Sequence, residues 1–216
     1  MDSAVTQKTH DFFSPYPIKK YDDKEIIIYA GDDPRGVYFL LSGQVKQYDI
    51  SSRGAEVVVN MFKPPAFFPM TWAINKTPNT YFFASHNSTT LKVAPAQDAL
   101  NFIQANNDVL YDLLRRIFLG AEGVQRRMVH MMSGTAKTRV LFELILCCQR
   151  FGEVKPDGSC KILLYETELA CRVGISRETT SRELNKLKQA GLLNMTRKYI
   201  FIKDLSNLEK ELLKDL

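Results

Sequence analysis

Arg177, Glu178, Ser181 and Arg182 form a compact group of polar residues in the segment "RETTSR". Their side chains carry the donors and acceptors that recognise base pairs from the major groove of DNA. Arginine can donate two hydrogen bonds to O6 and N7 of guanine, glutamate can accept one from N4 of cytosine, and serine can do either. We therefore interpret the four residues as candidates for base contacts. The alternative is an ordinary surface helix that is stabilised by salt bridges.

Two short helices are expected to position these side chains. The first, within 166–173, would end at Gly174, because glycine adopts the left-handed conformation at little cost. Ser176 is a favourable N-cap for the second helix, 176–189, whereas Tyr165 leaves the first helix without a capping side chain. The inner face of the second helix would consist of Thr180, Leu184 and Leu187. Two short helices with glycine in the turn and exposed polar residues at the start of the second are typical of a helix-turn-helix.

Basic residues surround this motif. The chain has a formal net charge of +5, and the segment 172–203 has eight lysine and arginine residues against two acidic ones. After Gly191, the sequence predicts two strands around 196–198, an arrangement known as a wing. Such a basic surface suits the phosphate backbone of DNA. The candidates for phosphate contacts are Thr167, Ser176, Thr179, Lys186, Arg197 and Lys198.

The first half of the chain has a different pattern. Between about Glu25 and Val93, short β-branched and aromatic runs alternate with turn signals, which predicts antiparallel hairpins in a small roll or barrel. Ser42-Gly43 is expected to be one tight hairpin turn. Six aromatic residues could line a pocket for an apolar or aromatic effector, or could simply fill the core. They are Phe62, Phe67, Phe68, Trp72, Tyr81 and Phe83.

A long helix is expected at 108–132. Its apolar residues recur at alternating steps of four and three, which is the a/d pattern of a coiled coil over three heptads. This seam consists of Leu110, Leu114, Ile117, Ala121, Val124, Met128 and Met131. We therefore predict a parallel coiled coil between two copies of the chain, although Gly120 and Gly123 lower the helix propensity. The alternative is that the seam packs against the β-domain of its own chain.

The sequence argues against several other classes of protein. The four cysteines form no CxxC pair, so neither a zinc site nor a disulfide framework is expected. We recognise no signal peptide and no apolar run of the roughly 18–20 residues that a membrane span needs, which predicts a cytoplasmic protein. A cupin-like metalloenzyme barrel would need clustered histidines and carboxylates, yet residues 57–97 contain His86 and no acidic residue. We therefore expect no catalytic residues, no bound metal and no enzyme activity.

Two segments, "GISRETTSRELNKLKQAGLL" and "GVYFLLSGQVKQY", resemble the cyclic-AMP receptor protein/FNR (Crp/Fnr) family of bacterial transcription regulators. The resemblance implies an α+β fold with an N-terminal antiparallel β-roll of the cyclic-nucleotide-binding-like, double-stranded jelly-roll type. A long dimerisation helix and a C-terminal winged helix-turn-helix would follow. The domains would be a β-roll sensor domain at 1–107, the dimerisation helix at 108–132 and the DNA-binding domain at 133–216.

The resemblance also implies a function. The protein would be a homodimer that binds a palindromic operator with TGA-like half-sites, and helix 176–189 would read the bases through Arg177, Glu178, Ser181 and Arg182. RNA polymerase would be a further partner. A small effector in the β-roll would shift the protein between two states. A regulator that binds DNA constitutively, without a ligand, is the alternative.

The cofactors known in the family are not expected here. Members that bind cyclic nucleotides use a glutamate and an arginine of the β-roll, but residues 57–97 contain no acidic residue and no arginine. A buried cyclic phosphate would then be badly compensated, with Lys63 or Lys76 as the substitutes for the arginine. The chain also lacks an N-terminal cysteine cluster for an iron–sulfur centre, and His10, His86 and His130 are isolated in the sequence. We therefore predict neither a cyclic nucleotide, nor an iron–sulfur cluster, nor haem.

Overall fold

The computed structural model describes residues 3–51, 54 and 56–214. The chain separates into two compact units, Met1–Phe118 and Leu119–Leu216. The boundary lies within one continuous helix, α4 (Asn107–Ser133), which matches the helix predicted at 108–132 to within one residue at each end. The units divide the chain by compactness, and the division into domains 1–107, 108–132 and 133–216 stays a prediction.

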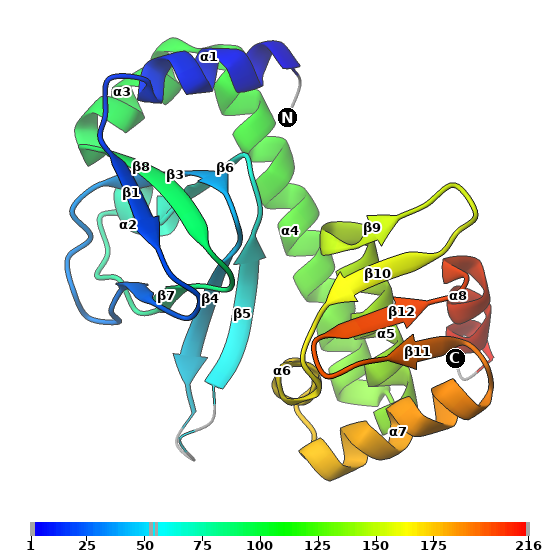
Figure 1. Cartoon of the computed structure of the whole chain (residues 1–216). Coiled ribbons are helices and arrows are strands. Elements are labelled where there is room, and N and C mark those ends of the chain that lie inside the picture. The colour runs from blue at the N-terminus through cyan, green and yellow to red at the C-terminus, as the bar shows by residue number, and fades with distance from the viewer. Residues whose placement is uncertain (1–2, 52–53, 55, 215–216) are drawn as a thin grey trace. The chain divides into compact units, whose positions relative to one another are not determined.

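The first unit contains two four-stranded antiparallel sheets (Figure 1). The strand order is β1-β8-β3-β6 in one sheet and β2-β7-β4-β5 in the other. The strands are β1 (Ile18–Tyr21), β2 (Ile26–Ile28), β3 (Val37–Ser42), β4 (Val45–Ile50), β5 (Glu56–Phe62), β6 (Ala66–Phe68), β7 (Phe82–Ser85) and β8 (Thr89–Ala94). The predicted β-roll is therefore confirmed.

The turn at Ser42-Gly43 differs from the prediction in its role. Gly43 has a φ of +84°, and a Cβ at this position would lie 2.5 Å from the carbonyl oxygen of Ser88, so glycine is required here. However, β3 and β4 belong to different sheets and are not hydrogen-bonded to each other. The turn carries the chain from one sheet to the other, and the expected hairpin is wrong. A local turn signal identifies the reversal of the chain but not the strand that becomes the partner.

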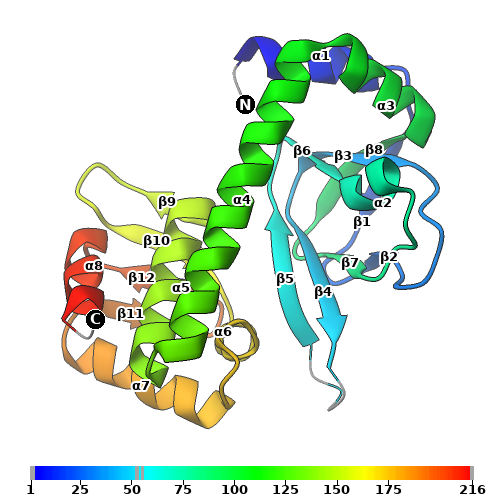
Figure 2. The ribbon, with the colours of Figure 1, turned by 180° about the vertical axis from the view of Figure 1, so that it is seen from behind.

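Three short helices accompany these sheets, α1 (Ser3–Phe13), α2 (Met70–Asn75) and α3 (Ala96–Ala105). Figures 1 and 2 show α1 and α3 side by side, next to the start of α4. The rings of Phe12 and Phe102 stack there at 4.2 Å between centroids, and Lys8 pairs with Asp108 at 2.6 Å. No sequence pattern predicted α1, whose packing depends on these distant residues.

Alternation along β3 divides the core of the first unit in two, because successive side chains of a strand point to opposite faces. Val37 and Phe39 face a cluster that includes residues of α1, α2 and α3. Tyr38 and Leu40 face a second cluster, to which both sheets contribute. The first unit is thus layered as helices, sheet and sheet.

The second unit has the elements of a winged helix-turn-helix (Figure 2). Its sheet has the order β11-β12-β10-β9. The elements are α5 (Ala136–Phe151), β9 (Glu153–Val154), β10 (Cys160–Leu163), α6 (Glu166–Val173), α7 (Arg177–Gln189), β11 (Leu193–Met195), β12 (Tyr199–Ile202) and α8 (Leu205–Leu213). One core joins them, with Leu141 of α5, Leu169 of α6 and Leu184 of α7 at its centre. In the part of the chain that the structure describes, no helix is long and apolar enough to cross a membrane.

Candidate nucleic-acid interface

The turn between α6 and α7 has the geometry that the sequence predicts. Gly174 ends α6 in the left-handed conformation, with φ 65° and ψ 34°. Ser176 caps α7, because its hydroxyl accepts a hydrogen bond from the amide of Thr179 at 3.1 Å. Tyr165 lies at the cap of α6 and makes no capping hydrogen bond with its side chain. These features confirm the helix-turn-helix and fix where α7 begins.

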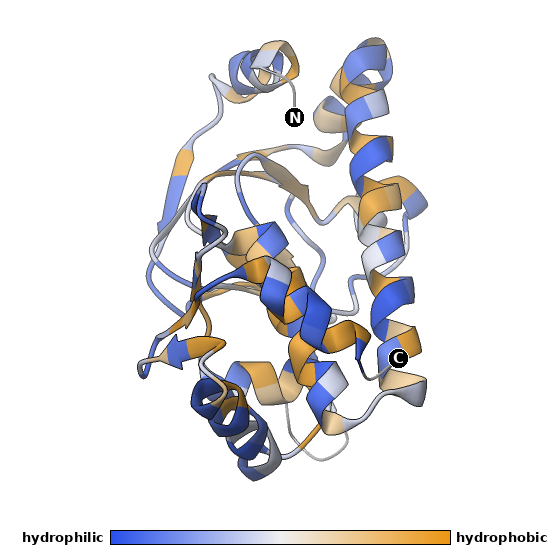
Figure 3. Ribbon diagram, turned by 90° about the vertical axis from the view of Figure 1, so that its right-hand side faces the viewer, coloured by the Kyte–Doolittle hydropathy of each residue, from blue (hydrophilic) through white to orange (hydrophobic). Residues whose placement is uncertain are grey.

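The two faces of α7 differ as expected. Thr180, Leu184 and Leu187 are buried in the core of the second unit, so they anchor the helix. The opposite face is hydrophilic and is drawn in blue at the bottom of Figure 3. Of the four predicted base-contacting residues, Arg177, Glu178 and Arg182 are exposed and Ser181 is half-buried.

The charges on this face remain available in different degrees. Arg177 lies 3.4 Å from the carboxylate of Glu166 on α6, and the pair is exposed enough to open at little cost. Among the described residues, Arg182 makes no ion pair or hydrogen bond. The pKa of Glu178 is lowered by its own backbone amide and by the hydroxyl of Ser176, so this side chain stays ionised and can accept hydrogen bonds.

The predicted phosphate contacts fall into two groups. Thr167, Arg197 and Lys198 are exposed, and the last two form the tip between β11 and β12. Two hydrogen bonds close this tip. The amide of Thr196 donates to the carbonyl oxygen of Tyr199 at 2.8 Å, and the amide of Tyr199 donates to the hydroxyl of Thr196 at 3.1 Å. The other three residues already have partners within the chain. The hydroxyls of Ser176 and Thr179 lie 3.1 Å apart at the cap, and Lys186 pairs with Glu183 at 2.7 Å.

The apolar seam of α4 is uncovered in the single chain. All seven predicted seam residues are exposed, for example Ile117 at 51% and Met128 at 55%. Tyr111, Phe118 and Met132, which the heptad pattern did not include, are exposed as well and widen the apolar face. Orange and blue turns therefore lie side by side along α4 in Figure 3.

The two glycines of α4 also lie in open space. A Cβ added at Gly120 or at Gly123 would meet no atom of the chain within 4 Å. The chain itself therefore gives no packing reason for residues that lower helix propensity. Within the first unit, the seam residues Leu110, Leu114 and Ile117 are exposed, so the alternative that the seam packs on the β-domain is not supported for this part of α4.

The six aromatic residues proposed for an effector pocket are divided between two clusters. Phe62, Phe68, Tyr81 and Phe83 belong to the cluster between the sheets, where the rings of Phe68 and Phe83 stack at 5.3 Å between centroids. Phe67 and Trp72 belong to the cluster near the helices. The six rings do not surround one pocket, because the alternation of β6 sends neighbouring side chains to opposite faces.

Of the six, Trp72 lines a separate, open cavity of about 490 Å³ in the first unit. Ala73 and Leu100 give the cavity apolar walls, and Asp32 and Lys76 add charge at its margin. Its volume falls in the range that holds small molecules. This cavity is built from α2, α3 and the loops next to them, which no local sequence pattern brings together.

The interior of the β-roll is packed with aromatic rings. Phe68 is completely buried and Phe83 is 2% exposed, so rings of the chain fill the space between the sheets. Residues 57–97 also provide no arginine for the cyclic phosphate and no carboxylate for the ribose. A buried phosphate would need a lysine in place of the arginine, and both Lys63 and Lys76 are exposed.

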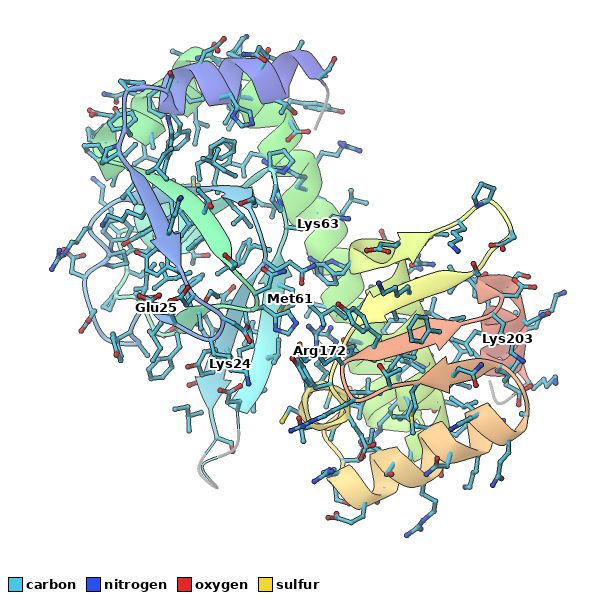
Figure 4. All side chains as sticks on the ribbon, viewed as in Figure 1. Lys24, Glu25, Met61, Lys63, Arg172 and Lys203 are labelled. Carbon is cyan, nitrogen blue, oxygen red and sulfur yellow. The ribbon has the colours of Figure 1, made fainter. Side chains whose placement is uncertain are left out.

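The second unit also contains a buried ion network that the sequence analysis missed. Arg172, which was counted among the basic residues suited to phosphate, is 7% exposed, so its assignment to a basic surface is wrong. Its guanidinium donates to Glu143 at 3.1 Å and to Glu168 at 2.9 Å. Arg127 of α4 donates two further hydrogen bonds to Glu143, both at 3.0 Å. Figure 4 labels Arg172 on α6.

Comparisons with known proteins agree with this architecture. Residues 18–106 match the model of the cyclic nucleotide-binding domain, and residues 138–211 match that of the Crp-like helix-turn-helix domain. The chain is 23% identical to the global nitrogen regulator of Synechocystis sp. over 93% of this chain and 90% of the relative. It is also 23% identical to the cAMP-activated global transcriptional regulator CRP of Haemophilus influenzae, over 88% of this chain and 86% of the relative.

Solved structures show the same fold. A CooA mutant from Carboxydothermus hydrogenoformans superposes with a TM-score of 0.75 at 19% identity, over 94% of this chain and 90% of that chain. A CRP/FNR-family transcriptional regulator from Thermus thermophilus gives a TM-score of 0.73 at 21% identity, over 92% of this chain and 98% of that chain. The matched domains, their order and the relatives along nearly the whole chain establish that this protein belongs to the Crp/Fnr family of DNA-binding transcription regulators.

Proposed function

We propose that the protein is a homodimeric transcription regulator that reads a palindromic operator with α7. The observation that carries this proposal is the division of α7 into two faces. Leu184 and Leu187 hold the helix in the core, while Glu178 and Arg182 remain exposed on the opposite side. A helix presented in this way can enter the major groove without rearrangement of its own unit.

Each exposed residue of α7 has a distinct role in this proposal. Arg177 and Arg182 donate to guanine, and Glu178 accepts from cytosine or holds an arginine fork in place. Ser181 contacts the base that faces it. The wing tip at Arg197 and Lys198 binds phosphates and sets the register of the helix on DNA. Thr167, Ser176, Thr179 and Lys186 are the further candidates for phosphate contacts, and Lys186 would have to exchange Glu183 for DNA.

The base contacts can be tested on the operator that is selected by the purified protein. Replacing one guanine of each half-site by 7-deazaguanine removes the N7 acceptor and leaves the rest of the base unchanged. We expect the affinity of the native protein to fall, because each bidentate contact is worth about 1–3 kcal/mol. Arg177→Ala or Arg182→Ala should make the protein insensitive to this change at the guanine that the missing arginine reads. If both variants remain as sensitive as the native protein, the base-reading role of these arginines is refuted.

We further propose that α4 forms a parallel coiled coil with α4 of a second copy. The exposed heptad seam supports this occupant, because its residues recur over three heptads on a 27-residue helix. Leu114→Glu places a charge in the seam and should convert the dimer to monomers in sedimentation equilibrium. Leu119→Glu is the matched control, because Leu119 is also exposed on α4 but lies outside the seam. A dimer built on this seam would be contradicted if both variants became monomeric to the same degree, or if both remained dimeric.

The open cavity beside Trp72 is the candidate site for a small effector. The chain has one tryptophan, so its intrinsic fluorescence reports on this cavity alone. We expect an effector to change this fluorescence and to change DNA affinity, and Trp72→Ala to abolish the effect on DNA affinity without changing affinity in the absence of effector. Cyclic AMP should change neither quantity. A protein whose DNA affinity responds to no ligand would instead be a constitutive regulator, and contact with RNA polymerase stays a prediction from the family.

A further inference from the structure

Four charged side chains of the second unit form one connected network across three helices. Glu143 of α5 lies at its centre, with 2% of its side chain exposed. Arg127 of α4 binds both carboxylate oxygens of Glu143, and Arg172 of α6 binds Oε1 at 3.1 Å. Glu168 of α6 accepts two hydrogen bonds from Arg172, at 2.9 and 3.2 Å. Two arginines and two glutamates thus balance in charge.

Stability alone does not explain such a network. Removing charges from water is costly, and apolar side chains of similar volume usually replace a buried ion network with little loss of stability or with a gain. Apolar side chains already lie beside the network, because Met131, Phe142 and Val173 line a small cavity together with its charged residues. Hydrogen-bonded ion pairs require a particular relative orientation of the two side chains, whereas apolar contacts do not. Bidentate arginine–carboxylate pairs hold the helices that carry them in one geometry.

The helices joined by the network are those that connect the seam of α4 to the DNA-reading helix α7. Arg127 lies on α4 between the seam residues Val124 and Met128. Arg172 precedes Val173 and Gly174, where α6 ends and the turn to α7 begins. Through Glu143, the end of α4 is therefore tied by hydrogen bonds to the helix that immediately precedes α7. A change in the tilt of α6 against α4 would break these bonds before it disrupted the apolar core.

We propose that Glu143 is a positioning residue for operator recognition. It fixes the orientation of α6 and α7 relative to α4, so that the two copies of α7 in the dimer match one distance between half-sites. This inference rests on the proposed function, since it needs a dimer through α4 and base reading by α7. The matched control is the ion pair of Arg126 and Glu122, which lies on the same helix α4 but is more than half exposed.

The test measures how strictly the protein requires one spacing between half-sites. The operator selected by the native protein is remade with its half-sites moved apart or together by one base pair, and a duplex with a single half-site is included. One base pair rotates a half-site by about 34° around the DNA axis. We expect the native protein to prefer its selected spacing by about tenfold or more, because a displaced half-site loses base contacts.

The decisive variant is Arg127→Met/Glu143→Met/Glu168→Met/Arg172→Met, which removes all four charges of the network. We expect it to bind the single half-site as the native protein does, to remain dimeric and to keep its melting temperature. Its preference for one spacing should fall to about threefold or less, because the directional contacts are gone. Arg172→Lys keeps the charge but loses the fork, and should weaken the preference partly. Glu122→Met/Arg126→Met should leave it unchanged.

Three results would overturn the proposal. The fourfold variant could keep the full spacing preference, it could lose affinity for the single half-site to the same degree as for the operator, or it could unfold. The last result would show that the network serves stability. Failure of the underlying function is distinguishable, because the native protein would then select no palindrome at all.

Discussion

The aromatic residues of the β-roll and the polar residues of α7 were both candidates for recognition in the sequence, yet the structure treats them in opposite ways. Phe68 and Phe83 are buried against each other between two sheets, whereas Glu178 and Arg182 are exposed on a helix whose other face is anchored. The difference teaches that a cluster of suitable residue types is not yet a site. The fold must anchor the backbone of a binding residue and leave its side chain exposed to the ligand.

Phe68→Ala should have the largest effect, a loss of stability, because it changes the buried aromatic core of the β-roll. The change removes a completely buried ring from a stacked cluster, which typically costs about 3–5 kcal/mol. Urea unfolding of the native and variant proteins measures this loss. Tyr29→Ala is the control, because Tyr29 is 53% exposed and its loss should cost less than about 1 kcal/mol. Equal costs would show that the rings of the β-roll do not form its core.

Arg182→Ala changes the exposed face of α7 and should weaken DNA binding without changing stability. We expect a loss of about 1–3 kcal/mol in each half-site, confined to the specific operator. Lys198→Ala at the wing tip should instead weaken specific and random DNA alike and lower the dependence of affinity on salt, because it removes a phosphate contact. Fluorescence anisotropy at several salt concentrations separates the two patterns. The interpretation of α7 fails if Arg182→Ala lowers both affinities equally.

Two substitutions of Ser176 distinguish its structural role as a helix cap from a contact with DNA. Ser176→Ala removes the cap of α7 and should lower stability by about 1 kcal/mol. Ser176→Asp keeps an N-cap acceptor and should retain the native melting temperature, but its negative charge should repel a nearby phosphate and weaken DNA binding. Undiminished binding by the aspartate variant would remove Ser176 from the candidate phosphate contacts.

His130 should give the smallest effect, which appears as a dependence of stability on pH. This residue is 9% exposed and its ring lies 4.2 Å from that of Phe142, and burial lowers the pKa of its imidazole below the ordinary value of 6.5. Arg127 and Arg172, which line the same small cavity, also disfavour a positive charge there, whereas Glu143 favours it. The unfolded chain therefore binds a proton more readily than the folded one, so stability is full above pH 6.5 and decreases as the pH falls below it.

The variant His130→Leu measures this contribution. It should remove part of the decrease in unfolding free energy between pH 7 and pH 5, while His86→Leu, a change at a half-buried histidine of the β-roll, serves as the comparison. If His130→Leu leaves the pH dependence as it is in the native protein, protonation of the buried imidazole does not limit stability.

Local signals account for much of what the sequence predicted correctly. Gly174 and Ser176 fix the turn before α7 through their own backbone and capping preferences, so neighbours in the sequence suffice. The heptad seam of α4 is likewise a property of one continuous segment. These features lie within a few turns of helix and were correctly placed.

Features that depend on distant partners were missed. Arg172 has the same side chain as the exposed Arg177, and only the placement of Glu143, 29 residues earlier, makes it a buried residue. The Ser42-Gly43 turn was recognised, but the sheet to which β4 belongs depends on β5 and β7. Pairing over long sequence distances leaves no local pattern, because it is decided by which apolar faces the whole chain can bury together.

The most direct test of the central claim is selection of duplexes from a random DNA pool by the purified, ligand-free protein at a stated salt concentration, since phosphate contacts make affinity strongly dependent on salt. We expect enrichment of a two-fold palindrome whose TGA-like arms lie about one helical turn, roughly 34–36 Å, apart. The same selection with Arg182→Ala should lose one position of each arm. Enrichment of a single, non-repeated element, or no enrichment by a folded dimer, would contradict operator reading by a pair of α7 helices in this state.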